Sequence, residues 1–363
     1  MSRTGASRTA AERALKQALT ARRTPGGTAA LTAGTRMTAL VDAGLSADHG
    51  WSTGTERTYR SVVRTQVRPA FDQLCLSEVT PGVIGRALST IAKNSGPGAA
   101  KTARACLSGM FALAVADGAV TVNPVRDAPA RLNTTAKKAP RALTRSETDR
   151  MVELFRGSAH AVALDLPDLV DWMLATGCRI GEALALRYGL NGDGRPLLDL
   201  DAGTWEVNAT VVRVRGRGLI VQPRPKTAAG WRVIALPDSA LRMLEDRPAP
   251  DDDAGIVFAA PLARGLRDPA NVSGHLRELL DGFDCDRCAR TGYQQPRIRC
   301  DEGPWSWVTS HTFRKTAATR LDEAGLSPRQ VADQLGHANP SMTLDVYFGR
   351  QVVSAEAARV LNR

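Results

Sequence analysis

The first third of the chain carries apolar residues at helical spacing, interrupted by Thr, Ser and Gly. Residues 55–68 predict one helix, which ends before Pro69. A second begins at Thr80 and Pro81, which suit a helix cap and a first helical position. It places one apolar face along Val83, Ile84, Leu88 and Ile91. Residues 99–116 predict a third helix that stops at Gly118. We therefore expect a helical domain over residues 37–128.

The pattern changes twice after this domain. Residues 129–142 are rich in proline and basic residues and predict an inter-domain linker. Thr144 and Glu147 then form a capping-box pattern, which predicts that a helix opens a second domain over residues 143–363. Short β-branched runs separated by Gly and Pro within 205–236 predict strands joined by tight turns. The expected fold class is mainly α with a small antiparallel β-sheet.

The composition favours a polyanionic partner. The 363 residues hold 48 Lys and Arg against 37 Asp and Glu, a formal net charge of +11. DNA, RNA and an anionic membrane surface all fit that charge. Because no apolar run reaches membrane-spanning length and the N-terminus lacks a secretory signal pattern, we expect a cytoplasmic protein without a membrane partner. Residues 1–36 predict a basic N-terminal arm, or simply a solvated tail.

Three short motifs in the second domain carry candidate chemistry. In LATGCRIGEAL, Arg179 falls in the first turn of a helix, where an anion is favoured, and Glu182 can brace its guanidinium. In SHTFR, His311 and Arg314 share one helix face. In QLGHANPSMTLDVY, a glycine ends a helix beside His337, and Tyr347 follows ten residues later. Each motif alone also fits a structural role, as a surface ion pair or a core residue.

Taken in order, the three motifs resemble the active-site boxes of the tyrosine recombinases, the family of phage integrases and bacterial chromosome-dimer resolvases. The resemblance covers residues 141–363. The helical segment before it is similar in kind to the core-DNA-binding domain of that family.

The resemblance implies a role for each motif residue. Tyr347 would attack the scissile phosphate, giving a 3′-phosphotyrosine and a free 5′-hydroxyl. Arg179 and Arg314 would hold the non-bridging oxygens, with Glu182 supporting from behind. His311 would assist proton transfer, and His337 would bind a phosphate oxygen. Lys226, in the turn before a predicted strand, would be the general acid, although it could instead merely contact a phosphate.

The resemblance also implies cofactors and partners. Strand cleavage and religation would require neither metal nor ATP. The partners would be double-stranded DNA attachment sites, a homo-tetramer in the synaptic complex and a DNA-bending accessory protein, with the enzyme located at the nucleoid. A helix carrying Val353, Ala357, Val360 and Leu361 on one face would pack on a neighbouring protomer or cover its own domain.

A cysteine-containing insertion near 284–301 departs from the family pattern. Cys285, Cys288 and Cys300 have spacing that suggests a structural zinc site, with His275 or Asp301 as a fourth ligand. Because zinc requires four ligands and only three cysteines are present, a metal-free loop is the favoured alternative.

Two other functions compete with site-specific integration or excision. A type IB topoisomerase shares the tyrosine chemistry and would relax supercoiled DNA as a monomer. A catalytically silent DNA-binding regulator could use the same fold, but it would not need Tyr347.

Overall fold

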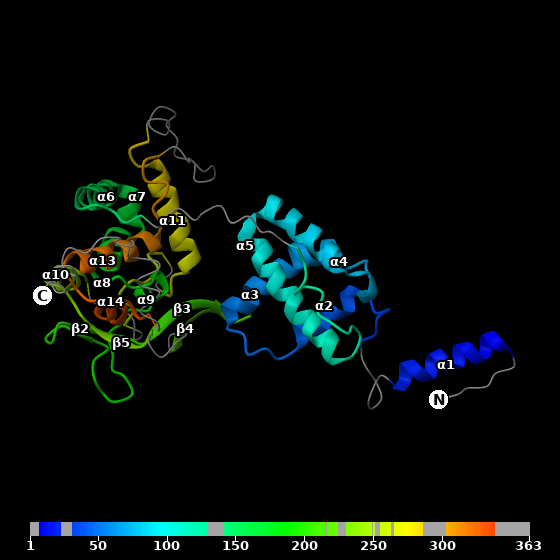
Figure 1. Cartoon of the computed structure of the whole chain (residues 1–363). Coiled ribbons are helices and arrows are strands. Elements are labelled where there is room, and N and C mark those ends of the chain that lie inside the picture. The colour runs from blue at the N-terminus through cyan, green and yellow to red at the C-terminus, as the bar shows by residue number, and fades with distance from the viewer. Residues whose placement is uncertain are drawn as a thin grey trace, which may run out of the picture. The chain divides into compact units, whose positions relative to one another are not determined.

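The chain folds as two compact units, each with its own hydrophobic core. The computed structural model describes residues 7–22, 31–129, 141–214, 216–223, 230–248, 250, 255–262, 265–285 and 303–337. The first unit runs from Met1 to Lys137 and the second from Lys138 to Arg363. Figure 1 labels their helices and strands.

The described part of the first unit is helical. Its elements are α1 (Arg8–Arg22), α2 (Met37–Ser46), α3 (Thr53–Val62), the π-helical turn η1 (Val63–Val67), α4 (Arg68–Phe71), the 3-10 turn η2 (Leu76–Glu78) and α5 (Pro81–Ala116). Ile84, Leu88 and Ile91 are buried, as their spacing predicts, and Val83 packs partly buried against the same core.

One predicted helix boundary in this unit is wrong. The helix expected to end before Pro69 continues through η1 into α4. The backbone N–H of Arg68 bonds to the carbonyl of Val63, five residues back, so the helix widens by one residue there. Pro69, which has no N–H to donate, then sits at the start of α4. The helix predicted from Pro81 and the helix predicted over 99–116 are both present: the non-helical residue Gly96, at φ 87°, separates them within the segment labelled α5.

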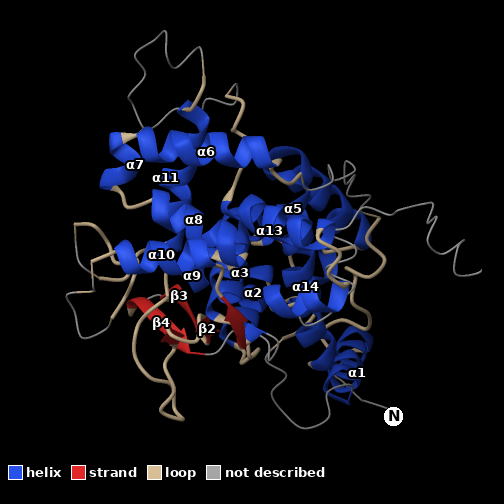
Figure 2. Cartoon of the chain, turned by 90° about the vertical axis from the view of Figure 1, so that its left-hand side faces the viewer, coloured by secondary structure: helices blue, strands red, loops and turns tan. Residues whose placement is uncertain are grey.

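The second unit combines helices with two small antiparallel sheets. Its elements are α6 (Arg145–Gly157), α7 (Ala159–Ala163), α8 (Pro167–Thr176), α9 (Ile180–Ala183), β1 (Leu198–Asp199), β2 (Thr204–Val207), β3 (Ala209–Val214), β4 (Gly218–Pro223), β5 (Arg232–Ala235), α10 (Asp238–Asp246), α11 (Pro269–Gly282), α13 (Ser310–Glu323) and α14 (Pro328–Leu335). One sheet has the order β1-β2-β5, and β3 pairs with β4. Figure 2 shows β2, β3 and β4 below α8, α9 and α10. The predicted fold class and the strands within 205–236 are confirmed.

Local sequence signals set where several of these elements begin. Thr144 caps α6 as predicted: its hydroxyl accepts from the N–H of Glu147, and the Glu147 carboxylate accepts from the N–H of Thr144 at 2.8 Å. The N–H of Leu143 donates to the Thr316 hydroxyl at 3.0 Å, which ties the start of the unit to α13.

The core of the second unit is built around α8. Trp172 on α8 is fully buried and lies 5.1 Å from Trp205 on β2 and 6.3 Å from Phe258, measured between ring centroids. Helix α13 packs against α8, and α14 packs against α13 and β5. This packing brings the end of α8, the start of α13 and the end of α14 to one place.

Candidate functional site

The turn between α8 and α9 positions Arg179. Gly177 closes α8 in the left-handed region at φ 66°, and a Cβ there would lie 2.7 Å from the Leu335 side chain, so glycine is required. Arg179 then caps α9, one residue before its first turn rather than within that turn. Its side chain is 42% exposed, and its Nη1 donates to Glu182 Oε1 at 2.7 Å.

Glu182 is a buried carboxylate shared by two arginines. Besides Arg179 Nη1, it accepts the backbone N–H of Arg179 at 3.0 Å and Nη2 of Arg232, on β5, at 3.0 Å. Burial alone would raise the pKa of Glu182, but the charges and hydrogen bonds of Arg232 and Arg179 outweigh it and lower the pKa. Glu182 is therefore ionised at neutral pH and braces both guanidinium groups.

Helix α13 contributes His311 and Arg314, three residues apart. His311 is exposed, while Arg314 is only 1% exposed. Nη1 of Arg314 donates to the carbonyl of Gly177 at 2.8 Å, and Nη2 donates to the carbonyl of Leu335. Arg314 therefore joins the α8 to α9 turn to the end of α14. Loss of surrounding water, with the positive charges of Arg314 and Arg179, lowers the pKa of His311.

The end of α14 places His337 beside Arg314. Gly336 closes the helix in the left-handed region at φ 70°, as predicted, and His337 N–H bonds back to the carbonyl of Ala332 at 2.9 Å. His337 Nε2 lies 2.8 Å from Arg314 Nη2. Because arginine can only donate, Nε2 must accept, and the ring proton is on Nδ1.

The protonation state of His337 agrees with that geometry. Burial, followed by the charges of Arg314, Arg179, Arg232 and His311, lowers the pKa of His337 to about 4. The imidazole is therefore neutral at physiological pH, as an acceptor for Arg314 requires. The structure thus groups the predicted residues Arg179, Glu182, His311, Arg314 and His337.

Other predicted site residues lie outside the described residues. These are Lys226, Tyr347, Cys288 and Cys300. Cys285 ends a described segment and is buried. Within the described ranges, no group of three or more His, Cys, Asp and Glu residues could hold a metal ion. The zinc site therefore stays a prediction. No helix among the described residues is long and apolar enough to cross a membrane.

Arg232 belongs to the same cluster through its bond to Glu182, although it lies outside the three sequence motifs. Along β5 the residues alternate between buried and exposed, and Arg232 faces inward with Ile234. An arginine at an inward position of an alternating strand is unusual because a buried charge needs a partner. That period of two is the signal that could have identified it.

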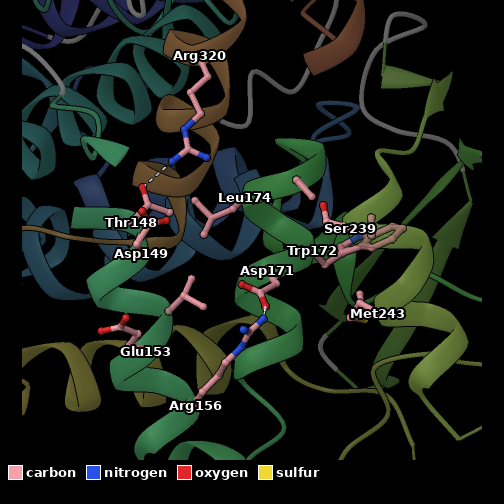
Figure 3. Close-up of a pocket in the computed structure, with 13 residues that line it drawn as sticks. Thr148, Asp149, Glu153, Arg156, Asp171, Trp172, Leu174, Ser239, Met243 and Arg320 are labelled. Carbon is pink, nitrogen blue, oxygen red and sulfur yellow. Dashed lines mark hydrogen bonds and ion pairs between the residues drawn. The ribbon is translucent and has the colours of Figure 1, made fainter. Parts of the chain in front are cut away.

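The second unit also contains a cavity of about 470 Å³, shown in Figure 3. Residues of α6, α8 and α10 line it, together with Arg320 of α13. Arg320 donates to the Thr148 hydroxyl at 2.8 Å, and Arg156 pairs with Asp171 at 2.5 Å. None of the clustered site residues lines this cavity.

Comparison with known proteins gives the class of this fold and site. The model of the phage integrase central domain matches residues 43–130, and that of the phage integrase family matches residues 294–352. The chain is thus similar to phage integrases in one stretch of each unit. The arginine and histidine cluster lies in the second unit, and the match to the phage integrase family model includes Arg314 and His337.

Sequence relatives are distant. A probable integrase of prophage ps2 from Lactococcus lactis is 22% identical over 181 residues, which are 50% of this chain and 43% of that protein. The chain therefore spans less than half the length of this relative. The integrase of Mycobacterium phage D29 is 24% identical over 313 residues, covering 84% of this chain and 73% of that protein.

Solved structures share the fold. The Tn1549 transposon integrase in complex with transposon right end DNA matches with a TM-score of 0.69 at 18% identity, over 90% of this chain and 98% of that one. A lambda integrase dimer bound to a COC′ core site matches with a TM-score of 0.58 at 20% identity, over 96% and 89%.

Proposed function

We propose that this protein is a site-specific DNA recombinase that cleaves and rejoins DNA through a 3′-phosphotyrosine at Tyr347. The phenolic oxygen attacks the scissile phosphorus, a new O–P bond forms, and the bond to the 5′ oxygen breaks. That oxygen takes up a proton and leaves as a hydroxyl. In religation a 5′-hydroxyl attacks the phosphotyrosine and releases Tyr347. Each step exchanges one phosphodiester bond for another, so no ATP or metal is needed.

The observation that carries this proposal is the grouping of Arg179, Arg314, His311 and His337 at one place. Phosphoryl transfer builds negative charge on the non-bridging oxygens, and fixed donors at that point stabilise the transition state. Arg179 is partly exposed and can contact a phosphate directly, whereas the buried Arg314 supplies positive charge from beneath. Their delocalised guanidinium groups suit phosphate better than ammonium groups do.

The two histidines suit proton and hydrogen-bond roles. A depressed pKa keeps His311 uncharged at neutral pH, so it can accept a proton as the tyrosine attacks. His337 carries its proton on Nδ1 and is proposed to donate to a phosphate oxygen. Lys226 is proposed as the acid that protonates the 5′ oxygen, a role that rests on the sequence resemblance.

The proposed partner is double-stranded DNA carrying an attachment site. The net charge of +11 favours that polyanion, and the structurally similar Tn1549 and lambda integrases were both solved in complex with DNA. We further propose that residues 37–128 form a core-DNA-binding domain, that residues 1–36 form a basic arm, and that four protomers assemble at the synapse. We also propose that an accessory protein bends the DNA at the attachment site and that the recombinase is located at the nucleoid.

Covalent trapping on a nicked suicide substrate tests the reaction. The wild-type chain is expected to give a DNA-linked band on a denaturing gel, and Tyr347→Phe is expected to give none. Tyr188→Phe is the matched control, because it removes a phenol elsewhere in the second unit and should leave the adduct intact. Absence of an adduct on DNA that the protein binds would favour the silent regulator.

A second assay separates recombinase from topoisomerase. A plasmid carrying two attachment sites should be recombined, with a product that depends on the relative orientation of the sites. Relaxation of a supercoiled plasmid that lacks any site, without recombination, would support the topoisomerase instead.

A further inference from the structure

Arg232 connects three segments of the second unit. Its side chain is 6% exposed, and its three nitrogens donate to acceptors in different places. Nη2 donates to Glu182 Oε2 at 3.0 Å, Nε to the carbonyl of Gln334 at 2.8 Å, and Nη1 to the carbonyl of Gly230 at 3.0 Å. One guanidinium therefore ties α9, the end of α14 and the segment before β5 together.

The end of α14 is held by two arginines from opposite elements. The last carbonyls of a helix have no partner within the helix and carry its partial negative charge. Arg232 from β5 binds the carbonyl of Gln334, and Arg314 from α13 binds the next carbonyl, that of Leu335. His337 lies two residues further on, so both guanidinium groups fix the turn that presents its imidazole.

Arg232 also acts on Arg179 through Glu182. The two oxygens of this carboxylate bind Arg179 through its side chain and backbone, and Oε2 binds Arg232 as well. Removing Arg232 would leave Glu182 with one guanidinium partner and a larger unshared negative charge. The carboxylate and the Arg179 side chain that it orients would then be free to rearrange.

We propose that Arg232 is a positioning residue of the recombination site, which sets the orientation of Arg179 through Glu182 and that of His337 through the end of α14. This inference rests on the proposed function. In this role Arg232 acts through Glu182 and the end of α14. Lysine cannot replace it fully, because a single ammonium cannot reach three acceptors that lie in different directions.

The pKa of His337 depends on the charges around it, so it provides a readout that the loss of a purely structural arginine would not change. Arg314 and His311 act on it from α13, Arg179 from the residue that caps α9, and Arg232 from β5. Arg232 lowers the pKa of His337, so its removal raises that pKa, and the uncovered charge of Glu182 raises it further.

The experiment compares Arg232→Met and Arg232→Lys with a matched control, Arg267→Met, in the full-length protein. Arg267 is another buried arginine, with its side chain 4% exposed and its Nη2 2.8 Å from the carbonyl of Leu164, and it lies outside the site. Three quantities are measured: the single-turnover rate of adduct formation on the nicked substrate, the dissociation constant for that DNA, and the His337 pKa by NMR of ¹³C-labelled histidine without DNA. His337→Gln assigns the signal among the five histidines.

Arg232→Met is expected to slow adduct formation by about 10- to 100-fold, the loss that a small misplacement of reacting groups causes, with DNA affinity nearly unchanged. The His337 pKa should rise most in Arg232→Met and less in Arg232→Lys, which keeps the charge. Arg267→Met should change neither the rate nor the pKa. If Arg232→Met does not fold, Arg232→Lys, which keeps charge and length, must still be slower than wild type.

The positioning role would be overturned if Arg232→Met formed the adduct at the wild-type rate or left the His337 pKa unchanged. It would also be overturned if Arg267→Met slowed adduct formation as much as Arg232→Met does. The NMR comparison needs no reaction. A wild-type protein that forms no adduct would therefore refute the proposed function while the His337 pKa still tests Arg232.

Discussion

Two arginine clusters in the second unit differ in how their charge is balanced. In the structural cluster, Arg247 binds Asp165 through both terminal nitrogens at 2.9 Å and Asp168 at 2.5 Å, and Arg267 lies 3.7 Å from Asp165. Two carboxylates thus face two arginines. This cluster fixes the loop before α8 to the end of α10.

The site cluster shares a single carboxylate between two arginines. Glu182 binds Arg179 and Arg232, while Arg314 beside them donates to carbonyl oxygens and to His337. Both histidines there have pKa values lowered first by loss of surrounding water and then by the nearby positive charges. A cluster that only stabilises the fold has no need of excess positive charge, whereas one that receives a phosphate does.

The largest expected effect comes from removing the shared carboxylate. Glu182→Gln leaves two arginines without their counter-charge, and breaking a buried ion pair costs about 3–5 kcal/mol of unfolding free energy. Urea denaturation measures this loss. Asp168→Asn in the structural cluster is the matched change. Asp168 is 38% exposed and Asp165 still serves Arg247, so we expect a loss below about 1 kcal/mol. Equal losses of unfolding free energy in Glu182→Gln and Asp168→Asn would contradict the proposed difference in charge balance between the two clusters.

The pH dependence of stability tests the excess positive charge. The pKa of His337 is about 4 in the folded protein against 6.5 for the free side chain, so the unfolded chain binds more protons between these values. Stability therefore falls as the pH drops from 6.5 towards 4, by up to about 3 kcal/mol for this residue. His337→Gln should flatten that part of the curve, measured by urea denaturation at a series of pH values. If His337→Gln left the slope of unfolding free energy against pH unchanged, the pKa of His337 would not be lowered in the folded protein.

The smallest expected effect lies in the structural cluster. Arg247→Lys keeps the charge but loses the two-pronged bond to Asp165, which we expect to cost about 1–2 kcal/mol of unfolding free energy. Adduct formation on the nicked substrate, assayed below the melting temperature, should stay at the wild-type rate. A slower reaction in this stable variant would mean that the cluster contributes to the site.

Much of the local structure follows from neighbouring residues along the chain. The Thr144 capping box, the strands within 205–236 and the glycine that closes α14 before His337 form as their patterns predict. Helical spacing also explains why His311 and Arg314 share one helix. The error at Pro69 arose because a π-helical turn depends on how the helix packs rather than on the local pattern.

By itself, the sequence determined the order of the motifs, the fold class and which residue types carry the candidate chemistry, because these depend on spacings of a few residues. Only the tertiary structure decided how those motifs meet. Arg314 reaches the carbonyl of Gly177 across 137 positions, and Arg232 reaches that of Gln334 across 102. The burial of Arg314, the neutral state of His337 and the inclusion of Arg232 all follow from these long-range contacts. Burial and charge depend on what surrounds a side chain in space, and no spacing along the chain records that.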